Sequence, residues 1–162
     1  MYLIFLLFSL VAFYILLLAL IPLFFEKPLN KFFKNISPIS ILSILVLGFL
    51  SFVLSFLIPD RELSNRVLHA VGGGVMGFVV CFLATKNSGV PITKFQFFSF
   101  SFLIVNMLGI GNEILEFVLQ EFGPFLFANS INDTWLDLVS NITGALIAGV
   151  VLTFLHKKAE QS

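Results

Sequence analysis

The side chains of this sequence that could take part in chemistry are ionisable or amide groups within or at the ends of long apolar segments. Carboxylates and histidine are the common groups of general acid–base chemistry, and the same nitrogen and oxygen donors can hold divalent cations. An ionisable group inside a membrane costs at least about 2.5 kcal/mol and usually faces a bundle interior or a watery cavity. The candidate functional residues are Arg66, His69, Glu113, Glu116, Asp133, Asp137 and Asn141.

The spacing of these residues places them on single helix faces, because residues three or four apart are neighbours on a helix. One stripe in the fourth apolar segment is Asn106, Gly109, Glu113, Glu116 and Gln120. A second stripe, in the fifth segment, is Asp133, Asp137, Asn141, Gly144 and Ala148. The third segment carries Arg66, His69, Gly73 and either Met76 or Gly77.

The elements that must position these stripes are membrane-spanning helices, each of which needs about 20 mostly apolar residues. The sequence predicts five, and thus an all-α integral membrane bundle forming one domain over 1–162. The first lacks the basic leading region and cleavage site of a signal peptide, so we expect it to be retained. Asp133 or Thr134 is the expected cap of the fifth. The predicted helices cover about 2–25, 38–58, 64–85, 93–120 and 134–155.

The connecting segment 122–133 is too short to span a bilayer and too apolar to be a free loop. It is therefore expected to be an interfacial or re-entrant piece.

Composition agrees with a membrane protein. Hydrophobic residues make up 59% of the chain and charged residues 11%, with 22 phenylalanines, so too little polar surface is available for a soluble fold.

The formal net charge is zero, which offers no electrostatic basis for binding nucleic acid. The single cysteine, Cys81, excludes an intramolecular disulfide and is expected to be a small core or lipid-facing residue.

Lysines and arginines of the connectors predict the orientation, since cytoplasmic loops carry an excess of both. Alternate connectors together with the C-terminal tail hold seven of them, and the opposite side holds two. The N-terminus is therefore predicted to lie outside and the C-terminus in the cytoplasm. This topology brings polar groups of helices three, four and five to the extracytoplasmic side at similar depth.

Structural explanations compete with functional ones. Glu116 and Asp133 could sit in water at helix ends, Arg66 could lie at the surface or reach a lipid headgroup, and His69 could be a packing residue. The glycines are expected to allow close helix approach through the small-residue pairs Gly73–Gly77 and Gly144–Ala148. The run 72–74 follows no strand, which argues against a phosphate-binding loop.

The order of these residues resembles the VanZ-like family of small bacterial membrane proteins. The similarity covers about residues 64–150 and rests on three features: a histidine opening one helix, Glu113 and Glu116 ending the next after a glycine-rich stretch, and Asp137-x-x-x-Asn141-x-x-Gly144-Ala145. This resemblance implies a multi-pass protein of the bacterial cytoplasmic membrane, part of the cell envelope. It implies no assigned reaction.

Four functions remain open at this stage. The first is a VanZ-like envelope protein whose outer pocket binds or modifies a lipid or lipid-linked component. In this case Glu113 and Asp137 act as ligands or acid–base groups, His69 as a proton carrier and Arg66 as a headgroup contact. Glu116, Asn141 and Asp133 would complete the binding site. The alternatives are a metal-dependent membrane enzyme, a proton or ion transporter, and a structural assembly partner. No cofactor is identified; a divalent metal has the right donors but no His-x-x-x-His pair.

Overall fold

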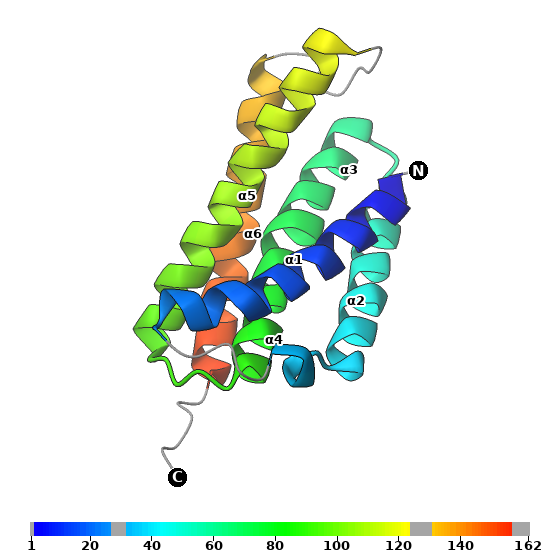
Figure 1. Ribbon diagram of the computed structural model, residues 1–162. Coiled ribbons are helices and arrows are strands. Elements are labelled where there is room, and N and C mark those ends of the chain that lie inside the picture. The colour runs from blue at the N-terminus through cyan, green and yellow to red at the C-terminus, as the bar shows by residue number, and fades with distance from the viewer. Residues whose placement is uncertain (1, 27–31, 124–130, 157–162) are drawn as a thin grey trace.

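A computed structural model describes residues 2–26, 32–123 and 131–156. Its described residues are helical with no strand, and five of its helices are long and apolar enough to cross a membrane. The prediction of an all-α bundle with five spans is therefore confirmed. In Figure 1 helix α6 ends at the lower end of the bundle, and helix α1 begins nearer the opposite end.

The first two spans are single helices. Helix α1 covers Tyr2–Phe24 and helix α2 covers Pro38–Phe56, with the short 3-10 helix η1, Phe32–Asn35, before α2. The hydroxyl of Ser37 caps α2 by accepting a hydrogen bond from the Ser40 amide at 3.3 Å. Both predicted helices are confirmed to within two residues of their ends.

The third span is continuous but contains three elements: α3, Arg61–Val67; η2, Leu68–Val75; and α4, Met76–Ser88. It begins three residues before the predicted start because the Asp60 carboxylate accepts a hydrogen bond from the Leu63 amide at 2.7 Å. It ends at Gly89, whose φ of +66° lies in the left-handed region that glycine adopts without strain.

The last two spans are α5, Lys94–Phe122, and α6, Ile131–Leu155. Thr93 and Gln96 form a reciprocal capping box at the start of α5. Helix α6 begins at Ile131, so Asp133 lies in its first turn, and the prediction that Asp133 or Thr134 caps this helix is wrong. Most of the predicted interfacial piece, 124–130, lies outside the described residues.

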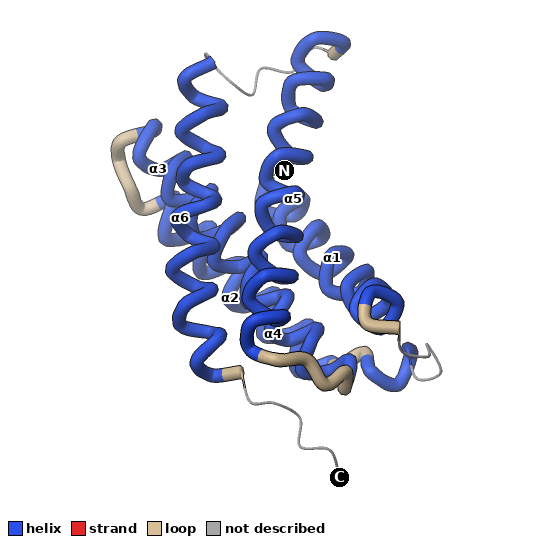
Figure 2. The backbone as a smooth tube through the Cα atoms, turned by 90° about the vertical axis from the view of Figure 1, so that its left-hand side faces the viewer, coloured by secondary structure: helices blue, strands red, loops and turns tan. Residues whose placement is uncertain are grey.

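The third span is the centre of the bundle. Its η2 segment packs against α2, α5 and α6, and its α4 segment packs against α1, α2, α5 and α6. Helices α5 and α6 run side by side and extend past the other helices at one end, while α1 crosses the bundle obliquely (Figures 1 and 2).

The tightest core lies at the other end of the bundle, where α4 ends and α5 begins. Tyr14, Leu17, Phe78 and Phe97 have no exposed surface there, and Cys81 is equally buried, as expected for a core residue. The end with the candidate residues is more open.

Candidate functional site

His69 is the second residue of η2, which is a stretch of π-helix. Wider turns of this kind are rare, occur mostly as short insertions in α-helices, and are frequent at functional sites. The sequence predicted an ordinary helix here. The three consecutive glycines of η2, Gly72 to Gly74, begin three residues after the histidine and leave that part of its backbone free of side chains.

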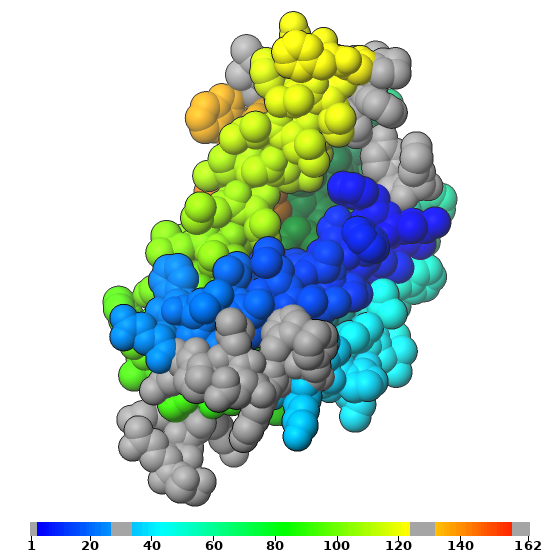
Figure 3. Space-filling view, viewed as in Figure 1, coloured from blue at the N-terminus to red at the C-terminus, as the bar shows by residue number. Residues whose placement is uncertain are grey.

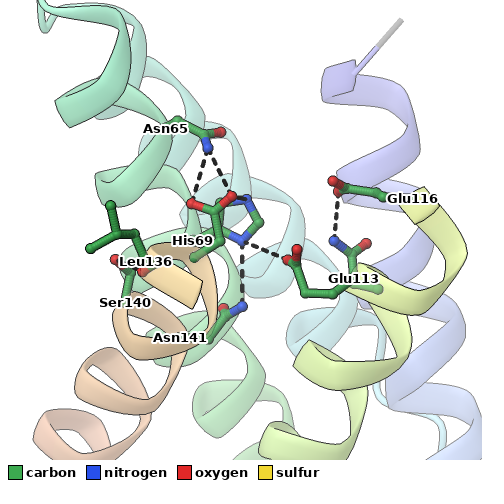
Figure 4. A network of polar contacts seen from close by, with 9 residues as sticks. Asn65, His69, Glu113, Glu116, Leu136, Ser140 and Asn141 are labelled. Atoms are coloured by element: carbon green, nitrogen blue, oxygen red, sulfur yellow. Dashed lines mark hydrogen bonds and ion pairs between the residues drawn. The ribbon is translucent and has the colours of Figure 1, made fainter. Parts of the chain in front are cut away.

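The His69 ring lies between two carboxylates that come from different helices. Its Nδ1 atom is 3.9 Å from Glu113 Oε1 on α5, and its Nε2 atom is 3.5 Å from Asp137 Oδ2 on α6. One potential ligand atom from each of the three residues lies within 4.8 Å of the other two. Figure 4 shows His69 and Glu113 pointing toward each other across the space between their helices. We call His69, Glu113 and Asp137 the three-helix cluster.

Two asparagines hold members of this cluster in place. The Asn65 side chain, on α3, donates to both carboxylate oxygens of Asp137 at 3.0 Å each. The Asn141 amide nitrogen lies 3.4 Å from His69 Nδ1, one turn along α6 from Asp137 (Figure 4). The two asparagines therefore come from the third and fifth spans, which also carry His69 and Asp137.

The carboxylates of the cluster are buried. Glu113 is 7% exposed and Asp137 is 4% exposed, whereas the His69 side chain is 15% exposed. Glu113 Oε1 is buried without a hydrogen-bond partner among the described residues. Neither carboxylate forms an ion pair with a lysine or arginine of the described residues. Two buried acidic groups thus share one histidine, which is positively charged only when protonated, and this arrangement is costly in an apolar medium.

The remaining candidates lie at the edge of the cluster or outside it. Arg66 pairs with Glu62 on its own helix at 3.3 Å, and its side chain is 39% exposed. Glu116 accepts a hydrogen bond from Asn112 at 2.7 Å, also within one helix, and is half-buried. Asp133 is half-buried in the first turn of α6. The structure therefore brings together His69, Glu113, Asp137 and Asn141 but places Arg66 in a surface pair.

Glycines allow the three helices to meet at this point. An added Cβ at Gly144 would overlap the Ala70 carbonyl oxygen, and one at Gly74 would overlap the Asn141 carbonyl oxygen. The backbones of η2 and α6 are thus in contact next to His69. Gly73 faces the Asn141 side chain in the same way, and Gly77 packs against Val105 of α5. The expectation that these glycines serve close helix packing is confirmed.

The bundle is hollowed on one side near the cluster. Helices α1 and α5 meet where Phe24 and Phe25 pack edge-on or tilted against Phe100, with ring centroids 5.4 and 5.7 Å apart. From there the two helices diverge, and in Figure 3 the surface recedes between the far part of α5 and the start of α1, with atoms of the third span at its floor. The hollow lies on the side of the bundle, between α1 and α5 (Figure 3).

Two residues of the polar network, Asn65 and Asn112, are not among the candidates predicted from the sequence. Asn65 precedes His69 by four residues and Asn112 precedes Glu116 by four, so both lie on the faces already identified. Their helical spacing was the signal that could have found them. The predicted third stripe begins at Arg66, one residue after Asn65.

Comparison with known proteins agrees with the fold. No curated protein and no solved structure matches this chain. A family model described as "Predicted membrane protein (DUF2238)" matches residues 3–158, almost the whole sequence. Together with the five apolar helices, this match shows a multi-pass membrane protein. The chain belongs to this family of predicted membrane proteins.

Proposed function

We propose that this protein is a VanZ-like component of the bacterial cell envelope that binds or modifies the polar part of a lipid or lipid-linked molecule. The observation that carries the proposal is the meeting of His69, Glu113 and Asp137 from three helices beside a lateral hollow. An amphiphile entering from the bilayer could place its apolar part between α1 and α5 and its polar part against the cluster.

The chemistry of the cluster fits a polar ligand. Asp137 is held by Asn65 at both oxygens, which orients the carboxylate as an acceptor for a hydroxyl or amine. His69 contacts both carboxylates and can pass a proton between a ligand and either of them. Glu113, Asp137 and His69 are the proposed acid–base groups, and Asn141, Glu116, Asp133 and Arg66 are proposed to lie along the path of the headgroup.

Two sequence features support the location of the proposed binding site at this end of the bundle. The connector charges predict that the cluster end of the bundle faces the outside of the cytoplasmic membrane. The motif order that resembles the VanZ-like family contains His69, Glu113, Asp137 and Asn141, the four residues that meet in space.

Transport is less well supported, because a proton or ion path needs steps across the whole bilayer. Residues 95–112 of α5 and 138–155 of α6 contain no Asp, Glu, His, Lys or Arg, and neither do residues 76–85 of α4. The charged groups therefore stop at the cluster.

Native mass spectrometry of the protein released from lipid nanodiscs tests the proposal. We expect a lipid of defined mass to stay bound to the wild type and to be lost at least about tenfold in Glu113→Gln and Asp137→Asn. Glu121→Gln, an exposed residue on the same helix as Glu113, is the matched control. Equal lipid retention in all four proteins would contradict the proposal. Failure of both site variants to fold would favour a structural role for the cluster.

A further inference from the structure

We infer that the three-helix cluster is a binding site for a divalent transition-metal ion of the zinc type. This inference rests on the proposed function only in taking the cluster as the site. One nitrogen and two carboxylate oxygens from three different helices are already gathered within 4.8 Å of one another. Imidazole and carboxylate are the donors that zinc and similar divalent ions accept in three-ligand sites.

One pair of ligand atoms in the cluster already has nearly the separation expected around a bound metal ion. Metal–ligand bonds of about 2.0–2.2 Å place the ligand atoms of a tetrahedral ion about 3.3 Å apart. The Nε2 atom of His69 and the Oδ2 atom of Asp137 are separated by 3.5 Å, near this value. The ligand atoms of the cluster lie within 4.8 Å of one another, so the widest separation must close by at most about 1.5 Å. Glu113 Oε1 lies 3.9 Å from Nδ1, the other ring nitrogen, so the flexible Glu113 side chain must rotate to reach an ion held by Nε2 and Asp137.

Glu113 supplies an independent sign that a ligand is needed. Its side chain is more than nine-tenths buried and directed toward His69, yet its Oε1 atom accepts no hydrogen bond from the described residues. Buried polar atoms are normally satisfied, so an orphaned carboxylate oxygen calls for a cation or an ordered water. Since two carboxylates share the site with one histidine, a doubly charged ion would neutralise them.

One of the proposed ligands, Asp137, has the supporting hydrogen bonds of a metal site. Metal ligands are usually oriented by a second layer of groups that bind their remaining atoms. Asn65 donates to both oxygens of Asp137 and so orients this proposed ligand, while Nε2 of His69 lies 3.5 Å from Asp137 Oδ2. Three protein ligands also leave a coordination position open, through which the ion could bind a phosphate or hydroxyl of a lipid headgroup.

Metal analysis of the full-length protein, purified with a histidine-free tag and without chelator, tests this inference. We expect about one zinc or similar divalent ion per chain, and a rise in the melting temperature of chelator-treated protein when Zn²⁺ is returned. Glu113→Gln should weaken Zn²⁺ binding at least about tenfold, and Asn65→Ala about 10–100-fold. Glu121→Gln should bind Zn²⁺ like the wild type.

A folded wild type that holds no stoichiometric metal and shows no shift with Zn²⁺ overturns the inference, even where the variants fail to fold. So does Zn²⁺ binding that Glu113→Gln leaves unchanged. The lipid measurement separates this result from the proposed function. Retained lipid without metal refutes the metal site alone, whereas bound metal without lipid refutes the proposed function alone.

Discussion

The Asn65 side-chain nitrogen on α3 lies 3.0 Å from each carboxylate oxygen of Asp137 on α6, joining two residues 72 positions apart in the sequence. The bond holds a buried acidic group at the point where three helices meet. It therefore couples the stability of the bundle to the geometry of the candidate site.

Replacing Asn65 by alanine is expected to lower the free energy of unfolding by about 1–3 kcal/mol, because it leaves the buried Asp137 carboxylate without its donor. In the Asp137→Asn background the same replacement should cost less, with a coupling energy of about 0.5–3 kcal/mol between the two residues. Thermal or denaturant unfolding of the four proteins in detergent measures this cycle. Strictly additive effects would show that the two side chains do not interact.

Replacing Gly144 by alanine is expected to destabilise the bundle by about 1–3 kcal/mol, because the new methyl group overlaps the backbone at Ala70. Gly111→Ala is the matched control, since nothing lies within 4 Å of its added Cβ. Alanine is the better helix former by about 1 kcal/mol, so the control should be neutral or stabilising. Comparison of the two melting temperatures tests the contact between η2 and α6. Similar effects of both replacements would argue against it.

Tyr14 is the centre of a polar network at the opposite end of the bundle. Its hydroxyl accepts hydrogen bonds from the Asn87 side chain at 2.7 Å and the Ser37 amide at 3.2 Å, linking α1 to α2 and α4. Tyr14→Phe removes the hydroxyl and is expected to cost about 1–3 kcal/mol, because two donors lose their acceptor. Unfolding measurements test the loss of stability.

The control for Tyr14 is Ser43→Ala, whose exposed hydroxyl bonds only the Ile39 carbonyl of its own helix. It should leave stability almost unchanged. The Tyr14 variant should also retain lipid and metal like the wild type, since this network is separate from the cluster. Loss of binding in Tyr14→Phe with intact folding would show that the two ends of the bundle are coupled.

The predicted orientation is open to a labelling experiment. In a Cys81→Ser background, a cysteine at Glu62 should react with a membrane-impermeant maleimide applied to intact cells, whereas one at Lys86 should react only after lysis. Both positions are exposed and lie at opposite ends of the third span. The reverse pattern would place the cluster on the cytoplasmic side.

The sequence by itself determined the number of spans, their extents to within a few residues, and the faces that carry polar groups. These properties follow from apolar length and helical periodicity, which are local. The observed start of a helix differs from the predicted one where a side chain caps the helix, as Asp60 does for α3. Segment 124–130, most of the predicted interfacial piece, lies outside the described residues.

Only the tertiary structure decided which members of each stripe meet. Arg66 lies about 60° from His69 around a regular helix and Asn65 about 40°, so small rotations select between them. The structure turns Asn65 toward Asp137 and leaves Arg66 paired with Glu62. The sequence pattern likewise did not predict the π-helical turn at His69. Rotation and register of packed helices depend on contacts such as Gly144 against Ala70, which join residues far apart in the chain and leave no periodic signal.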